Sequence, residues 1–227
     1  RFFVSAPEKI TFGAGVGDTA FATTTISPDG RRLAFVARDA AGKVLIWVRP
    51  LDTLAAQALQ GTDGAVFPFW SPDSRFLGFF AQGKLKKIDV AGGPAQTLCD
   101  ATNGRGGTWN RDGVILFAPN NAGAIYRVTS AGGEPVAVTK LQQQTGQRFP
   151  SFLPDGRHFL YYALGTNPGI FVGTLDSGES KRLMVADTSA LYSPSGDLLY
   201  VRQGTLLRQS FDTGKLELSG DPTPVAE

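Results

Sequence analysis

Two arginines occupy equivalent places in a recurring sequence pattern. Arg105 stands four residues before Trp109, and Arg148 stands four residues before Phe152. The loops that carry them are rich in small and polar residues, among them Asn103. Guanidinium groups donate several charge-assisted hydrogen bonds to carboxylates and phosphates. The pair therefore predicts a binding site for an anionic group, with Asn103 as a neighbouring polar contact.

Two acidic residues, Asp63 and Asp187, are the main carboxylates expected near the same end of the fold. Paired carboxylates in one cavity would indicate a small lactonase or glycosidase, because such enzymes need two acids or a metal. Asp63 and Asp187 belong to distant segments of the chain, which disfavours that function. A second interpretation of Arg105 and Arg148 also stays open: two solvated loop arginines, since arginine is common at protein surfaces.

Four aspartates recur at one position of the sequence pattern. They are Asp29, Asp73, Asp112 and Asp155. Each occupies the same position of a tight turn, where an Asp side chain accepts backbone N–H bonds. Equivalent turns of different units lie too far apart to share an ion. We expect a structural role for all four, and no metal site.

Signatures of catalysis are missing from the sequence. It has one Cys and one His, His158, so neither a Cys/His zinc site nor a disulfide framework can be built within it. Gly13–Asp18 lacks the Lys-Ser/Thr of a phosphate-binding loop, and neither a Gly-x-Ser-x-Gly elbow nor kinase motifs occur. The sequence predicts that this chain is not itself an enzyme and needs no cofactor.

Composition and charge exclude further classes. The 227 residues carry 22 basic and 20 acidic side chains, a balance that argues against nucleic-acid binding. No apolar stretch approaches the roughly 18 residues of a membrane helix, so we expect no membrane span within the chain. The high content of Gly (28), Pro (14) and Phe (16) favours β-structure with many turns. The chain begins with Arg1, and we expect it to be a piece of a longer protein.

A turn-and-strand block of the type Ser-Pro-Asp-Gly-Arg-Arg-Leu-Ala-Phe-Val recurs five times. The equivalent first positions are Ser27, Ser71, Asn110, Leu153 and Ser193, at steps of 39 to 44 residues. Pro presets the turn, Asp caps it, and Gly takes its left-handed corner. Two further short strands follow in each unit. Four short strands in about 40 residues are typical of a β-propeller blade.

The sequence therefore predicts an all-β fold, a β-propeller with five visible four-stranded antiparallel blades. We expect one propeller domain or fragment over residues 1–227, with an N-terminal strand and loop at 1–21 and blades at about 22–60, 66–99, 105–139, 148–185 and 188–227. The segment Arg1–Ser5 is predicted to add a strand to a blade. Two ring interpretations stay open: a closed five-blade ring, or five blades of a larger six- to eight-bladed ring.

The block at residues 27–36 resembles the WD-like repeat of TolB-type propellers, and the resemblance covers about residues 22–227. Within that group the chain is most similar to propeller regions appended to bacterial serine/threonine protein kinases. Four departures from the pattern put local turn geometry in doubt. These are Asn110-Arg111 for Ser-Pro, Ser74 for Gly, Leu153 for Ser, and Ser195 for Asp.

This resemblance implies a non-catalytic sensor or protein-interaction module within a larger bacterial signalling protein. The expected partner is a protein, a peptide or a small anionic ligand at the mouth of the central channel. Attachment to a membrane kinase would place the propeller on the periplasmic side, and otherwise a cytoplasmic location is expected. The main alternative function is the gating propeller of a prolyl oligopeptidase-like hydrolase.

Overall fold

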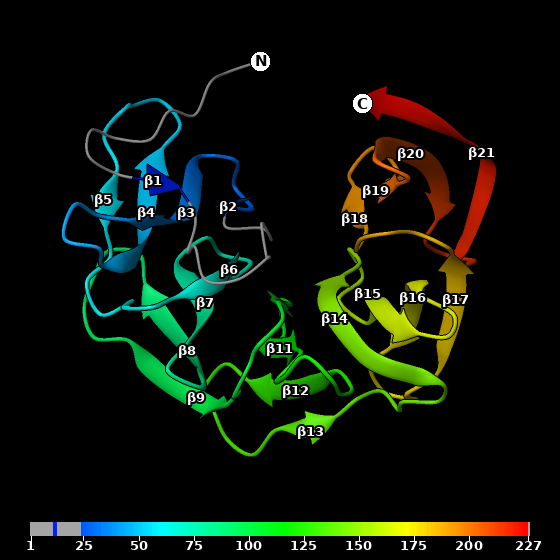
Figure 1. Ribbon diagram of the computed structural model, residues 1–227, viewed down its shortest axis with the longest axis horizontal. Coiled ribbons are helices and arrows are strands. Elements are labelled where there is room, and N and C mark those ends of the chain that lie inside the picture. The colour runs from blue at the N-terminus through cyan, green and yellow to red at the C-terminus, as the bar shows by residue number, and fades with distance from the viewer. Residues whose placement is uncertain (1–10, 13–23, 227) are drawn as a thin grey trace.

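The structure is a computed structural model that describes residues 11–12 and 24–226, and every regular element among them is a β-strand. The strands form five antiparallel sheets around a common centre (Figure 1). Each sheet has four consecutive strands, and the first sheet also contains the short strand β1. The predicted fold, a propeller with five four-stranded blades, is confirmed.

The strands follow one another from the centre of the propeller outward in each blade. Blade one contains β1 (Thr11–Phe12), β2 (Thr24–Ile26), β3 (Arg32–Arg38), β4 (Val44–Pro50) and β5 (Gln57–Ala58). Blade two contains β6 (Val66–Trp70), β7 (Phe76–Ala81), β8 (Lys84–Asp89) and β9 (Gln96–Asp100). Blade three contains β10 (Gly107–Trp109), β11 (Val114–Phe117), β12 (Tyr126–Thr129) and β13 (Val136–Ala137). Blade four contains β14 (Gln144–Phe152), β15 (His158–Gly165), β16 (Gly169–Thr174) and β17 (Ser180–Met184). Blade five contains β18 (Leu191–Ser193), β19 (Asp197–Arg202), β20 (Thr205–Asp212) and β21 (Glu217–Ala226).

The outermost strands vary most in length between blades. In blade three, β13 has two residues, and the preceding Pro135 has no N–H to extend the pairing. In blade five, β21 has ten residues because pairing with β20 begins directly beyond the turn, where Glu217 faces Asp212. Two register shifts then let this hairpin continue to Ala226.

Apolar residues on facing sheets hold neighbouring blades together. Ala34 and Val36 of blade one pack in one cluster with Leu77 and Phe79 of blade two. Similar clusters join blades two and three, three and four, and four and five. Because a blade is apolar on both faces, each one is stable only against its neighbours.

Blades one and five stand at the two ends of the arc of blades (Figure 1). Among residues 24–225, whose side chains are described, no buried cluster joins β2–β5 to β18–β21. Leu33, Phe35 and Ala37 form a separate cluster on the face of blade one that points away from blade two. Both ring interpretations stay predictions, and the predicted strand Arg1–Ser5 falls outside the described residues.

Three of the four repeated aspartates cap their turns as expected. Asp29 and Asp73 each accept a hydrogen bond from the serine two residues earlier and from a backbone N–H two residues later, at 3.0 Å. Asp155 accepts two backbone N–H groups at 2.9 Å, from Arg157 and His158. These bonds to the ionised form lower the pKa of Asp29 and Asp73 below the usual value.

In blade three, Asn110 supplies the side-chain acceptor of the turn that contains Asp112. Asn110 occupies the serine position, and its Oδ1 accepts the backbone N–H of Asp112 at 3.1 Å and of Val114 at 2.9 Å. An asparagine carries its own carbonyl acceptor, so the turn needs no carboxylate at position 112. The left-handed corner is retained, with Gly113 at a φ of 78°. In blade two Ser74 adopts the same conformation without being glycine, at a φ of 59°.

Candidate functional site at the mouth of the central channel

The innermost strands of blades two, three and four share a backbone kink. Phe67, Gly106 and Phe149 each stand three residues before the aromatic residue that begins the turn, and each has a positive φ, of 50°, 84° and 54°. The pairing register of β6 and of β14 shifts at these points. Arg105 and Arg148 directly precede two of the kinked residues. Their equivalence in the sequence is therefore also an equivalence of backbone geometry.

Aromatic side chains of blades two and four meet beside blade three. The rings of Phe67 and Phe149 lie 5.7 Å apart between centroids, at an interplanar angle of 55°. Gly106 lies against Phe149, and a Cβ there would sit 2.8 Å from Cδ1 of Phe149 and 3.0 Å from its Cα. The absence of a side chain at Gly106 thus allows the two phenylalanines to approach each other, and we name them the aromatic bridge.

Arg105 lies over this bridge on the side of the loops that lead into the inner strands. Its Cζ is 5.8 Å from the centre of the Phe67 ring, within cation–π range. Its Nη1 donates to Oδ1 of Asn103 at 2.6 Å and to the carbonyl of Gly104 at 3.1 Å. Burial and then the nearby charge of Arg148 lower the pKa of Arg105. The fold thus holds two cationic groups near one another.

Arg148 has unused hydrogen-bonding capacity. Its Nη2 donates to the backbone carbonyl of Asn121 at 2.9 Å, while its Nε is buried and has no acceptor among the described residues. Within the part of the chain that the structure describes, neither Arg148 nor Arg105 forms an ion pair with a carboxylate. A buried donor without an acceptor is costly, so an anionic ligand at this point would be favoured.

The two acidic residues expected near the mouth take different places. Asp187 accepts the backbone N–H of Gln203 at 2.6 Å. Burial raises the pKa of Tyr162; the charge of Asp187 adds to this rise, and the charge of Arg148 opposes it.

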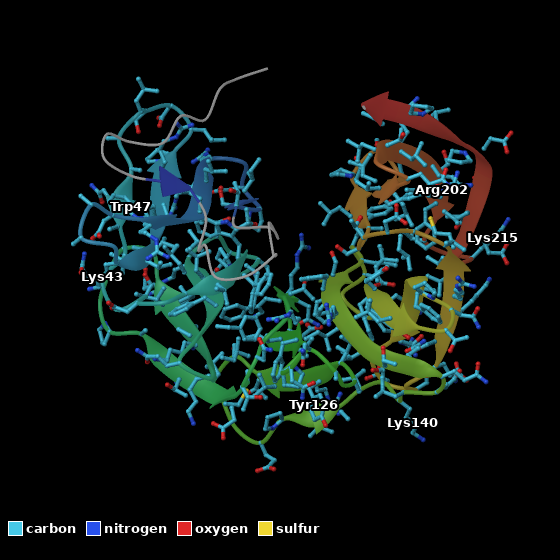
Figure 2. The ribbon with its side chains drawn as sticks, viewed as in Figure 1. Lys43, Trp47, Tyr126, Lys140, Arg202 and Lys215 are labelled. Atoms are coloured by element: carbon cyan, nitrogen blue, oxygen red, sulfur yellow. The ribbon has the colours of Figure 1, made fainter. Side chains whose placement is uncertain are left out.

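Asp63 does not contact the arginines. Its Oδ1 is 2.8 Å from Nζ of Lys43, and this interaction lowers its pKa. Lys43 is on the outer side of blade one in Figure 2, so the fold pairs Asp63 away from the mouth.

Sequence inspection missed the aromatic bridge, although a signal for it exists. Phe67-Pro68 and Phe149-Pro150 are the same dipeptide at the same place in two units. A non-glycine residue with positive φ is uncommon, so the kink itself could not be inferred from the phenylalanines. Tyr162 was also overlooked, because nothing in the repeat pattern links it to Arg148.

Two other side chains with chemical reactivity, His158 and Cys99, are hydrogen-bonded and buried, respectively. His158 is paired through Nδ1 with Oδ2 of Asp155 at 2.6 Å, a partner that the sequence did not reveal. Cys99 is buried, and burial raises the pKa of its thiol to about 11. Among the described residues, no group of three or more His, Cys, Asp or Glu side chains is placed to hold a metal ion.

Comparisons with known proteins identify solved structures with a similar fold. No family model matches the chain. TolB from Acinetobacter baumannii superposes on 89% of this chain and 53% of its own, with a TM-score of 0.68 and 18% identity. A putative TolB from Agrobacterium tumefaciens superposes on 89% of this chain and 79% of its own, with a TM-score of 0.70 and 16% identity. The fold is that of the TolB propellers.

Other relatives share the propeller or part of the sequence. The β-propeller domain of Myceliophteria thermophila Cps50 (Swd1) superposes on 92% of this chain and 72% of its own, with a TM-score of 0.68 and 15% identity. In sequence, the uncharacterized protein Atu1656 of Agrobacterium fabrum is 28% identical over 153 residues, 59% of this chain and 48% of that protein. The chain thus spans about half the length of this curated relative. Across residues 11–12 and 24–226, we find no helix with the length and apolarity to cross a bilayer.

Proposed function

We propose that this propeller is a non-catalytic binding module that receives an acidic segment of a protein or peptide at the mouth of its channel. One observation carries the proposal: Arg105 and Arg148 converge without a carboxylate partner among the described residues, and the Nε of Arg148 is buried with no acceptor there. A carboxylate between the two guanidinium groups would accept hydrogen bonds from both.

The surrounding residues prepare this site for an anion. Asn103 holds one edge of the Arg105 guanidinium, and the Asn121 carbonyl holds Nη2 of Arg148. Orienting both groups in advance lowers the ordering cost of binding. Rigid blades that carry variable loops are a common way to present such a site.

The same proposal extends to the parent protein. We infer that the propeller is the ligand-binding region of a larger bacterial signalling protein, such as a serine/threonine kinase. On a membrane kinase it would stand on the periplasmic side, and without such an attachment it would be cytoplasmic. The resemblance of the repeat at residues 27–36 to kinase-appended propellers supports this role.

A binding titration tests the mouth. The probe is a short fluorescein-labelled peptide rich in glutamate, and the variants are Arg105→Ala and Arg148→Ala. We expect each to weaken binding about ten-fold, the range of one charge-assisted hydrogen bond. Arg127→Ala is the matched control, because it removes the same charge from an exposed residue of β12. If Arg127→Ala weakened peptide binding equally, the effect would come from net charge alone, and the proposed site would be refuted.

A second candidate function is the gating propeller of a prolyl oligopeptidase-like hydrolase. A structure from a study of two prolyl endopeptidases superposes on 98% of this chain and 37% of its own, with a TM-score of 0.59 and 15% identity. The sequence flanking this chain in its gene separates the two functions. A serine hydrolase domain there would favour the gating function, and a kinase domain with a membrane span would favour the signalling module.

A further inference from the structure

A cavity of 890 Å³ lies at the centre of the propeller. Its wall receives residues from the innermost strands of all five blades and from the segment that leads into β18. Large apolar side chains in the wall include Ile26, Phe67, Trp70, Trp109, Phe149 and Leu191. None of the described residues that line it has an ionisable side chain. Its volume falls within the range of about 300–1,000 Å³ that is common for small-molecule sites.

This cavity is separate from the arginine site. Its lining includes Phe67, Gly106 and Phe149 but neither Arg105 nor Arg148, although each arginine directly precedes one of those residues. The aromatic bridge is therefore the boundary between the two spaces beside blade three. A ligand in the cavity would therefore contact lining residues other than the two guanidinium groups.

Two large apolar side chains of the cavity wall are left in water. Ile26 of β2 is 52% exposed, and Leu191 of β18 is 62% exposed. Both line the same cavity from opposite ends of the arc of blades. Covering exposed apolar surface of this kind is favourable, so an apolar ligand would be stabilised between them.

The polar groups in the wall are few and partly engaged. Nε1 of Trp70 donates to the carbonyl of Thr25 at 3.2 Å, and Oγ1 of Thr108 accepts the backbone N–H of Phe152 at 3.2 Å. Ser151 and Ser189 add hydroxyl groups to the lining. A mostly apolar wall with a small number of polar groups suits an uncharged ligand whose orientation is fixed by one or two hydrogen bonds.

We propose that this cavity is a second binding site, for an uncharged and predominantly aromatic small molecule. Trp109 in the wall is only partly buried, and a flat ring packs favourably against the accessible part of an indole. Pro68 and Pro150 fix the backbone behind the bridge, which makes this wall rigid before binding.

Titration with N-phenyl-1-naphthylamine, an uncharged aromatic probe, tests the site in the full chain. We expect saturable binding of one probe per chain. Ser151→Phe and Ser189→Phe place a ring in the cavity and should each weaken binding at least ten-fold. Ser219→Phe adds the same ring on the exposed strand β21 and should leave binding unchanged. Equal affinity of the Ser151 and Ser189 variants and the wild type would overturn the proposal.

Two further measurements show whether a loss of probe binding comes from misfolding or from the arginine site. Leu191→Asn alters an exposed residue and should weaken probe binding without filling the cavity. The double variant Arg105→Ala, Arg148→Ala should bind the probe normally while losing the glutamate peptide. Loss of probe binding in the arginine variant would merge the two sites into one and overturn the proposal, whereas loss of peptide binding alone concerns only the proposed function.

Discussion

The two spaces along the channel are built from the same strands but have opposite chemistry. At the mouth, Arg105 and Arg148 gather positive charge. Beyond the aromatic bridge, Trp70 and Trp109 line a cavity in which none of the described wall residues has an ionisable side chain. Along the chain, Arg105 and Arg148 each directly precede a kinked residue, whereas Trp70 and Trp109 each stand three residues after one. One repeated backbone feature therefore lies between the site proposed for anions and the site proposed for apolar molecules.

Replacing Gly106 should disturb both spaces most strongly. Gly106→Val would place a branched side chain against Phe149 at a φ of 84°, where a Cβ already lies 2.8 Å from Cδ1 of that ring. We expect the free energy of unfolding to fall by about 3 kcal/mol or more. We also expect the variant to bind neither the glutamate peptide nor the naphthylamine. Chemical denaturation measures the first effect.

Gly30→Ala is the control for this variant. Gly30 also has a positive φ, 69°, but a Cβ there meets no heavy atom within 4 Å. It should cost about 1 kcal/mol, from the backbone conformation alone. Equal costs at Gly106 and Gly30 would show that the contact with Phe149 is unimportant.

Weakening the aromatic bridge should lower the affinity for both ligands, but by less than Gly106→Val does. Phe67→Leu removes the cation–π contact with Arg105 and the ring contact with Phe149. We expect about 1–2 kcal/mol of lost stability and several-fold weaker binding of both the glutamate peptide and the naphthylamine. Parallel titrations of the two probes check this. A change in only one affinity would mean that the bridge is not shared by the two sites.

Salt should separate the two sites without any substitution. Raising the NaCl concentration from about 50 mM to about 500 mM shortens the range of electrostatic interactions. Peptide binding at the arginines should weaken several-fold, while naphthylamine binding should stay constant. The measurement is a pair of titrations at each salt concentration. Similar salt dependence of the two affinities would contradict the assignment of charge to only one site.

The smallest effects are expected at the turns that border the cavity. Asp73→Ala removes an acceptor of two hydrogen bonds and should cost about 1 kcal/mol, whereas Asp112→Ala should stay within about 0.5 kcal/mol because Asn110 caps that turn. Denaturation midpoints at neutral pH compare them. Equal costs would support the expected role of Asp112.

The same pair of variants predicts a pH dependence. The folded pKa of Asp73 lies below its unfolded value, so its stabilising contribution is complete above the unfolded value and is lost as the pH falls through the folded one. The difference in stability between wild type and Asp73→Ala should therefore shrink below about pH 4. A difference that grows on acidification would contradict the hydrogen bonds assigned to the carboxylate.

Much of the fold was accessible from the sequence because the turn chemistry is local. The Ser-Pro-Asp-Gly type of turn marked all five blades, even where Asn110 or Ser195 replaced the usual residue. Side-chain partners across the molecule were less accessible. The pairing of Asp63 with Lys43 and the use of Asn110 in place of Asp112 both depend on atomic distances that the spacing of residues does not contain.

The sequence by itself determined the number of blades and the equivalence of Arg105 and Arg148, because each follows from a pattern repeated along the chain. Only the tertiary structure decided that Phe67 and Phe149 meet, with Gly106 against Phe149. That contact depends on how far each blade is rotated about the common centre, and this rotation is set by the packing between blades and not by any single repeat.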